Sequence, residues 1–496
     1  MRGCPRVTAA LVVAMCSLAP TGLAQGGKDV LDIGSRLELF VDDYLIGSMT
    51  GVALRLHPPT PREIVQTYAE PWEGSGCGYQ QVFRDGDIVR MYYTSQDLTD
   101  DAATRLGRHP CYVCYSQSTD GIHWTKPALG LFEFNGSHEN NIVWAGPDLD
   151  NFTVHKDANP AYRPGEEYKA VSSGKGGLLA YKSSDGLHWS LLRPEPIITE
   201  GAFDTQNIVF WDKQRGHYWA YIRGFHNGLR DIRVATSTDF LTWTEPELLR
   251  YEDSPEEQLY TNQVEPYFRA PHIFVGFPTR YVERRWEPSF EYLPDVAHRQ
   301  ARMKFSPRYG TAVTDGLFMS SRDGRLFRRW GEAIIRPGIE RGRNWVYGDG
   351  YQSYGLLETQ AADPLAPSEL SAYVPENYWK ESLCLRRYTF RMDGFVSLNA
   401  PLKGGEMVTK PLTFAGKQLL LNFATSAAGS VKVEVQDEAG RPLPGHSLAD
   451  CDDVFGDAVE RPVSWKASTD VSALAGKPVR LRFVMRDADV WAMGFR

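Results

Sequence analysis

Three carboxylates stand where apolar, strand-like segments begin, and they could do acid–base chemistry there. Asp204 lies within 203–207, ahead of the strand expected at 208–211, and Glu265 lies within 261–266, where another such strand begins. Glu73, within 71–74, precedes an earlier strand. Two carboxyl groups held close together can divide the work, because crowding raises the pKa of one, which donates a proton, while the other stays ionised.

Cleavage of a glycosidic bond needs such a division, since one group protonates the leaving oxygen and another acts as nucleophile or base. Aromatic and cationic residues lie near these acids in the sequence, as expected for a sugar site. Further polar residues precede or begin other strands of the same kind. We expect the substrate-binding residues to be Trp72, Asp150, Asn207, Arg223, Arg280 and Asp349.

A short phrase recurs along the chain and predicts the fold that positions these residues. It reads Ser-Thr-Asp-Gly-Ile-His-Trp at 118–124 and Ser-Ser-Asp-Gly-Leu-His-Trp at 183–189, with looser copies at 237–243, 320–327 and 391–395. Asp-Gly is a turn signal, and the aromatic residue that follows can pack between neighbouring sheets. Repeats of short strands at this kind of period indicate a β-propeller, so five phrases predict five blades.

The blades align on their first hairpin, in which an apolar strand is followed by a turn and then an aromatic strand. Asp85, Asp157 and Asp212 occupy the turn of the first three hairpins, where an Asp typically caps its own backbone. We therefore interpret them as structural, together with Asp120, Asp185 and Asp323 of the repeated phrase. Functional side chains are expected instead where each innermost strand begins, beside the central axis.

Three further segments surround these blades. The strand-like segment 37–46 is expected to complete the last blade and close the ring, which would give Asp42 and Asp43 a structural role. A charged, aromatic insertion at 283–305 suits a loop folded over a binding face. From residue 400 the alternating patterns at 431–435 and 479–483 predict a β-sandwich. The expected domains are a propeller at 29–399 and a sandwich at 400–496.

With its repeated phrases and C-terminal sandwich, the chain resembles secreted bacterial glycoside hydrolases of the five-bladed propeller superfamily, whose relatives are the β-fructosidase and arabinanase/xylosidase groups. The resemblance implies three acids where innermost strands begin. Asp204 is similar to the stabilising or orienting Asp. Glu265, followed by Pro266, resembles the Glu-x-Pro general acid but lacks the intervening residue. No Asn-Asp-Pro-Asn-Gly precedes the first blade, so the nucleophile or base is assigned by position to Glu73, with Asp42, Asp43 and Asp150 as competitors.

The hypothesis is therefore a glycoside hydrolase acting on a plant or algal glycan or oligosaccharide. The main alternative is a non-catalytic carbohydrate-binding propeller. A polysaccharide lyase is a third hypothesis. A sialidase-like hydrolase is less consistent with the phrase, because sialidases use Ser-x-Asp-x-Gly-x-x-Trp, whereas here Gly directly follows Asp.

Composition sets the remaining bounds. The 496 residues carry a net charge of −8 and no basic run, which argues against nucleic acid as a partner. Residues 1–24 read as a signal peptide, so a secreted or periplasmic protein is expected, and no later apolar run is long enough to span a membrane. The sequence carries no signal for an oligomeric state.

The cysteines and histidines do not suggest a cofactor. Five cysteines remain after the signal segment, an odd number that argues against a disulfide framework, although one disulfide stays open. Cys111 and Cys114 lack a second pair at zinc spacing, and the histidines show no ligand spacing. We expect no cofactor and no transition metal, and leave open a structural calcium ion in the channel.

Overall fold

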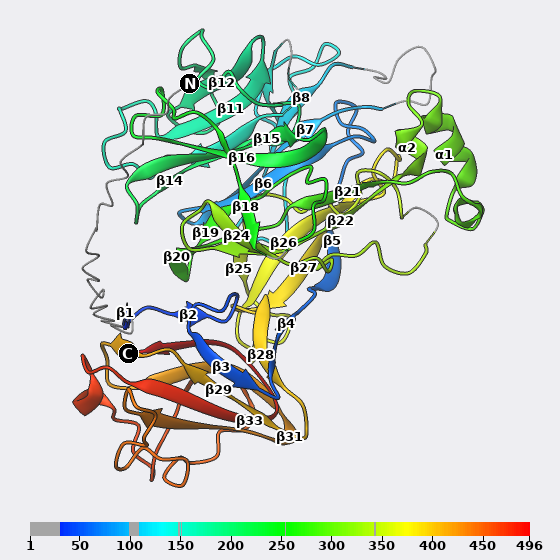
Figure 1. The fold of residues 1–496 in the computed structure, drawn as a ribbon. Coiled ribbons are helices and arrows are strands. Elements are labelled where there is room, and N and C mark those ends of the chain that lie inside the picture. Colours follow the sequence, from blue (N-terminus) through cyan, green and yellow to red (C-terminus); the bar gives the residue numbers. More distant parts are fainter. Residues whose placement is uncertain (1–29, 99–108, 147–148, 150, 253, 342–343) are drawn as a thin grey trace, which may run out of the picture.

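The computed structural model describes residues 30–98, 109–146, 149, 151–252, 254–341 and 344–496. The predicted signal peptide at 1–24 and Asp150 lie outside the described residues. Strands dominate (Figure 1), and the helical elements are α1 (Val296–Met303), α2 (Arg308–Thr311) and two short 3-10 segments, Pro288–Glu291 and Ser472–Leu474. None of the helices in the described part has the length and apolarity needed to cross a bilayer.

Five sheets form the blades of a propeller, which confirms the predicted blade number. Blade one contains β6 (Gly78–Asp85), β7 (Ile88–Ser95), β8 (Tyr112–Ser118) and β9 (Ile142–Ala145). Blade two contains β10 (Thr153–Lys156), β11 (Tyr168–Gly174), β12 (Gly177–Ser183) and β13 (Ser190–Leu191). Blade three contains β14 (Ile208–Asp212), β15 (His217–His226), β16 (Leu229–Ser237) and β17 (Glu247–Leu248).

The last two blades are less regular. Blade four contains β19 (Glu265–Tyr267), β20 (Ala270–Gly276), β23 (Met319–Ser321) and β24 (Leu326–Arg329), with β18 (Arg250–Glu252) parallel to β24 at its edge. Between β20 and β23 a separate hairpin of β21 (Thr279–Glu283) and β22 (Ala312–Gly316) carries the insertion with both helices. Blade five contains β25 (Leu357–Thr359), β26 (Glu369–Glu376), β27 (Cys384–Arg391) and β5 (Thr60–Thr67).

The ring is closed by β5, which pairs antiparallel with β27 at the edge of blade five. The prediction that 37–46 closes the ring is therefore wrong. Within that segment, β2 (Glu38–Leu39) pairs with β33 (Arg480–Phe495), and β3 (Ile46–Thr50) pairs with β29 (Gly405–Thr409). Asp42, between them, forms an ion pair with Arg322 at 2.7 Å. The segment 37–46 and β5 each pair with the edge of a sheet, but the apolar alternation of a segment does not show which edge it pairs with.

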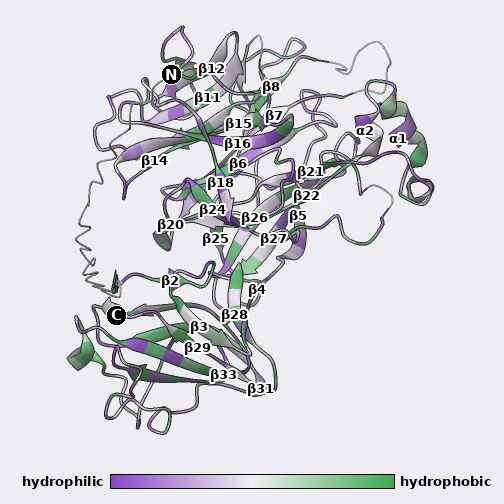
Figure 2. Ribbon diagram, in the orientation of Figure 1, coloured by the Kyte–Doolittle hydropathy of each residue, from purple (hydrophilic) through white to green (hydrophobic). Residues whose placement is uncertain are grey.

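The remaining strands build the predicted C-terminal β-sandwich, drawn below the propeller in Figure 1. They are β1 (Leu31–Gly34), β4 (Ala53–Leu56), β28 (Val396–Ala400), β30 (Leu412–Phe414), β31 (Leu419–Gln436) and β32 (Asp457–Pro462), with β2, β3, β29 and β33. Val431, Val433 and Val435 of β31 are buried in its core, as their alternation with polar residues predicted. Hydrophobic and polar stretches alternate along many of the strands (Figure 2).

The repeated phrase forms one turn in four blades, directly after the third strand. In blade one, Ser118 Oγ accepts the backbone N–H of Gly121 at 2.9 Å, and Asp120 Oδ1 accepts the N–H groups of Ile122 and His123, each at 2.8 Å. The same bonds recur around Asp185, Asp239 and Asp323. The structural interpretation of the Asp residues in this phrase is therefore confirmed.

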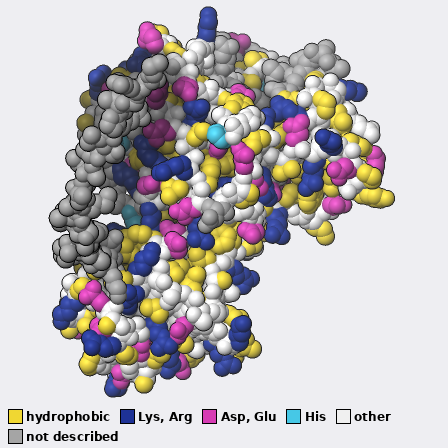
Figure 3. Space-filling model, viewed as in Figure 1, with side chains coloured by type: hydrophobic (Ala, Val, Ile, Leu, Met, Phe, Trp, Pro, Cys, Tyr) yellow, Lys and Arg dark blue, Asp and Glu magenta, His cyan; other side chains and the backbone are white. Residues whose placement is uncertain are grey.

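These turns also join neighbouring blades. Tyr92 of blade one donates its hydroxyl to the carbonyl of Gly186 in blade two at 2.9 Å, and Tyr221 of blade three does the same to Gly324 in blade four, also at 2.9 Å. The blades are thus held by hydrogen bonds as well as by apolar packing. On the molecular face in Figure 3, acidic and basic side chains are interspersed.

Candidate functional site

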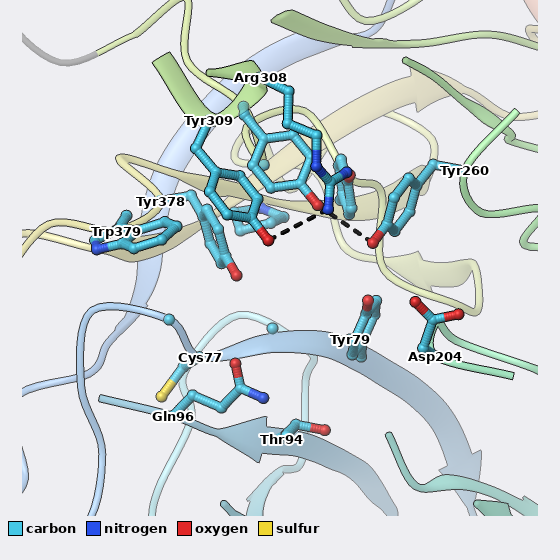
Figure 4. Close-up of a pocket in the computed structure, with 16 residues that line it drawn as sticks. Cys77, Tyr79, Thr94, Gln96, Asp204, Tyr260, Arg308, Tyr309, Tyr378 and Trp379 are labelled. Atoms are coloured by element: carbon cyan, nitrogen blue, oxygen red, sulfur yellow. Dashed lines mark hydrogen bonds between the residues drawn. The ribbon is translucent and has the colours of Figure 1, made fainter. Parts of the chain in front are cut away.

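A pocket lies where the innermost strands of the propeller begin, which is where functional side chains were expected. Its lining comes from the start of β6 and the segment before it, from the end of β7, from the segments before β14, β19 and β25, from α2, and from the end of β26 and the turn that follows it. The pocket contains about 810 Å³ of empty space, a volume that includes open solvent at its mouth. Among the lining residues are Tyr79, Gln96, Asp204, Tyr260, Arg308, Tyr309, Tyr378 and Trp379 (Figure 4).

Asp204 is the carboxylate that lines this pocket among the described residues. Its side chain is 68% exposed, and Oδ1 forms an ion pair with Arg223, which is only 3% exposed. The Arg223 guanidinium also lies over the ring of Tyr260, 4.8 Å from its centroid. The buried Arg223 cation therefore holds one carboxylate oxygen of Asp204, while the rest of this carboxylate is exposed to the pocket.

The loop that carries Asp204 is held by Asn207, one of the residues predicted for the site. Asn207 is fully buried, and its side-chain amide donates to the backbone carbonyls of Phe203 at 3.0 Å and Thr205 at 2.9 Å. Phe203 also accepts a hydrogen bond from Asn151 at 2.8 Å. Asn207 therefore positions Asp204 through the backbone and does not line the pocket itself.

Seven aromatic residues of the described part contribute to the remaining wall. Ring centroids are 5.4 Å apart for Tyr260 and Tyr351, 5.5 Å for Tyr309 and Tyr347, and 5.4 Å for Tyr309 and Trp379. The hydroxyl of Tyr347 donates to that of Tyr260 at 3.2 Å. Flat apolar faces combined with hydroxyl groups suit a ligand that is polar at its edges and apolar on its faces, as a sugar ring is.

Helix α2 delivers part of this wall and stands directly after the insertion expected at 283–305, none of whose described residues lines the pocket. Helix α2 places Arg308 and Tyr309 in the pocket. Helix α1 packs behind them through Arg302, which is fully buried, lies 4.5 Å from the ring centroid of Trp379 and donates to the carbonyl of Tyr347 at 3.2 Å. Burial lowers the pKa of Arg302 to about 10, so the side chain remains a cation at neutral pH.

Asp349 lies behind the wall. It is 6% exposed and accepts the backbone N–H of Tyr378 at 2.7 Å, which fixes the turn that carries Tyr378 and Trp379. Burial raises the pKa of Asp349 to about 7, despite the nearby guanidinium of Arg302. Asp349 thus supports the wall from behind and does not line the pocket.

Four other predicted residues do not line the pocket either. Glu73 is fully buried and bonds to Tyr93 at 2.6 Å and Lys126 at 2.7 Å, and burial raises the pKa of its carboxyl. Trp72 donates to Asn141 at 2.6 Å. Arg280 binds both oxygens of Asp315, at 2.9 and 2.7 Å, and lines a separate cleft. The fourth residue is Glu265.

Glu265 is the first residue of β19 and stands five residues after Tyr260, which lines the pocket. The carboxyl lies beside Tyr354 and Leu356, between the innermost segments of blades four and five. It keeps some accessible surface, yet burial raises its pKa to about 8. The structure therefore brings Asp204 and Arg223 together, and places Glu265 and Glu73 elsewhere.

The axis below the pocket is lined by amides. Gln263 donates to Gln206 at 2.6 Å, Gln206 donates to the carbonyl of Tyr79 at 3.0 Å, and Gln81 bonds to the backbone of Phe152 and Val154. These glutamines join the innermost strands of different blades.

Sequence reasoning missed the tyrosines and Arg308. One signal was available, because a tyrosine stands before the innermost strand in two blades, at Tyr260 and Tyr351, and at the second residue of that strand in blade one, at Tyr79. Arg308 follows the insertion by only three residues, but nothing in its sequence neighbourhood distinguishes it from the other arginines there.

No protein-family model and no curated protein sequence matches this chain. Solved structures with a similar fold include a glycosyl hydrolase from Bacteroides ovatus, with a TM-score of 0.42 and 13% identity over 71% of this chain and 95% of that one. A GH62 α-L-arabinofuranosidase catalytic domain from Coprinopsis cinerea has a TM-score of 0.42 and 9% identity, covering 67% and 97%. A mannose phosphorylase from Leishmania mexicana, in complex with a phosphate ion, has a TM-score of 0.40 and 11% identity, covering 67% and 89%. Likenesses at this level carry no argument about the activity of this chain.

Proposed function

We propose that this chain is a glycoside hydrolase and that one sugar ring of a glycan binds in the pocket with Asp204 at the scissile bond. The observation that carries this proposal is the placement of Asp204, an exposed carboxylate at the start of an innermost strand, held by buried Arg223 and surrounded by aromatic rings. A carboxylate so placed can stabilise the positive charge that develops on the sugar ring in the transition state.

A second function, non-catalytic carbohydrate binding, is favoured by a different observation. Of the three acids predicted to be catalytic, Asp204 alone lines the pocket, whereas glycosidic cleavage commonly uses two carboxyl groups. A binding protein would need the aromatic wall but not a proton donor.

The test is hydrolysis of a panel of plant and algal glycans by the purified protein and by Asp204→Asn. We expect the wild type to release sugar and the variant to lose at least about 100-fold in kcat. Asp87→Asn, at an exposed turn of blade one, is the matched control. Hydrolysis that survives in Asp204→Asn would refute the assignment, and a wild type that binds glycans without cleaving them would establish the second function.

We also propose that the chain is exported, on the basis of the signal-like residues 1–24. Expression in a bacterium, followed by N-terminal sequencing of protein from the periplasm and medium, tests this. A product that stays in the cytoplasm with residues 1–24 still attached would contradict it.

A further inference from the structure

Arg308 is a cation in the pocket that pairs with no carboxylate of the described residues. Its guanidinium points into the pocket (Figure 4), donates to the hydroxyl of Tyr309 at 3.2 Å and lies 4.7 Å from the centroid of that ring. The Nη1 atom is buried and lies on the side of Tyr281, so it is not the part of the side chain that meets a ligand. Arg308 nevertheless lines the pocket, and the exposed part of its guanidinium faces the ligand space.

Other arginines differ from Arg308 in this respect. Arg223, Arg280 and Arg322 each form ion pairs with carboxylates, although they lie in three different parts of the fold. The chain has 62 acidic and 54 basic residues, so acids are in excess. A partly buried cation without a counter-ion is costly, and such a cost is commonly retained where a ligand supplies the missing charge.

The surroundings of Arg308 add positive charge. Arg230 lies 4.6 Å from the ring centroid of Tyr281, and Arg299 and Arg302 are buried in α1 behind the pocket. On the acidic side, Asp204 is already paired with Arg223. Behind the wall the arginines are partly offset by Glu283, which accepts from Tyr281 at 3.3 Å, and by Asp349. At the pocket lining itself, Arg308 and the Arg223–Asp204 pair leave one positive charge in excess, and this favours anionic ligands.

We infer that the glycan bound in this pocket carries a carboxylate, as uronic acids do, and that Arg308 binds that carboxylate. A guanidinium presents its N–H donors in a planar fork that matches the two oxygens of a carboxylate. The hydroxyl of Tyr309 is placed beside this fork. Asp204 projects from a different part of the pocket (Figure 4), so the carboxylate and the scissile bond can be held by different groups. This inference rests on the proposed carbohydrate site and specifies its substrate class.

The experiment is a calorimetric binding comparison on the full chain. The probes are uronic acid oligosaccharides, the same oligosaccharides after reduction of their carboxyl groups to neutral alcohols, and sulfated neutral oligosaccharides. We expect wild type to bind the uronates at least about tenfold more tightly than their reduced forms, with a preference that weakens as salt is added. Equal affinity for both forms, or tighter binding of the sulfated probes, would overturn the inference.

Variants assign the preference to Arg308. Arg308→Gln should lose it, Arg308→Lys should keep part of it, and Arg84→Gln, at an exposed position of blade one, should leave it unchanged. A preference that persists in a folded Arg308→Gln protein would overturn the role of Arg308. The two proposals can fail separately. Selective binding of uronates without hydrolysis would support this inference and refute the proposed hydrolase activity. Equal hydrolysis of neutral and acidic glycans would support the hydrolase activity and refute this inference.

Discussion

The hydroxyl of Tyr373, in the last blade, donates a hydrogen bond to the carbonyl oxygen of Gly121, in the first blade. The two residues are 252 positions apart in the sequence. The bond repeats the link between Tyr92 and Gly186 and that between Tyr221 and Gly324. The junction where the ring closes is therefore built from the same parts as two junctions within it.

Removal of the Tyr373 hydroxyl should weaken this junction without altering the pocket. We expect Tyr373→Phe to lower the free energy of unfolding by about 1 kcal/mol, as for a typical lost hydrogen bond. Chemical denaturation measures this, and Tyr162→Phe, at an exposed position, is the control. Unchanged stability together with altered ligand binding would contradict the purely structural role.

Gly355 tests how closely blades five and one approach each other. Its φ is +98°, and a Cβ atom there would lie 2.0 Å from the backbone oxygen of Val82. Gly86 also has a positive φ, of +61°, but an added Cβ would meet nothing within 4 Å. Because overpacking costs about 1–3 kcal/mol beyond backbone strain, we expect Gly355→Ala to destabilise by at least about 1 kcal/mol more than Gly86→Ala. Equal losses in denaturation midpoint for the two variants would show that blades five and one can move apart at Gly355 and Val82 to admit the methyl group.

Glu265 gives a prediction for pH. Burial raises the pKa of its carboxyl from 4.5 to about 8. The unfolded chain releases this proton near its ordinary pKa while the native state retains it, so the contribution of Glu265 to stability falls as the pH rises from 4.5 through 8. Wild type should lose stability over this interval relative to Glu265→Gln, as measured by denaturation across the pH range.

The same variant separates two views of the site. Because Glu265 does not line the pocket, Glu265→Gln should keep glycan binding and hydrolysis, as should the exposed control Glu256→Gln. A loss of hydrolysis in Glu265→Gln alone would instead support the sequence-based assignment of a general acid.

Asn207 should affect activity through the position of Asp204. We expect Asn207→Ala to lower kcat by about tenfold or more, because a small misplacement of a catalytic group is costly. Asn140→Ala is a matched control, since Asn140 also donates from a buried amide to a backbone carbonyl, that of Phe132 at 2.7 Å, outside the pocket lining. Similar losses of stability with a fall in kcat only for Asn207→Ala would confirm the positioning role. Equal kcat in both variants would refute it.

The propeller could be predicted from the sequence because its blades carry a local pattern, the repeated turn phrase. The turn at Asp120 is closed by side chains within three residues, so its sequence is sufficient to define it. The site was harder to predict, because it joins residues from distant segments. Asp204 could be found by its place before a strand. Glu265 could not be placed, since the pocket residues Asp204 and Tyr260 stand four and five residues before β14 and β19, whereas Glu265 is the first residue of β19. Which strand pairs with β27 depends on competition between two similar segments, and local patterns do not decide that.

Strands from both ends of the chain meet in the sandwich: β2, β3 and β4 pair with β33, β29 and β28, respectively. A protease that cut once, between the propeller and residue 396, would therefore leave the two parts tethered through 57–59, and a second cut would be needed to release them. A recombinant propeller that starts at residue 60 and stops before 396 lacks the sandwich strands from both ends of the chain. The propeller is thus an insertion within the sequence of the sandwich, and it can be exchanged between proteins as one continuous segment.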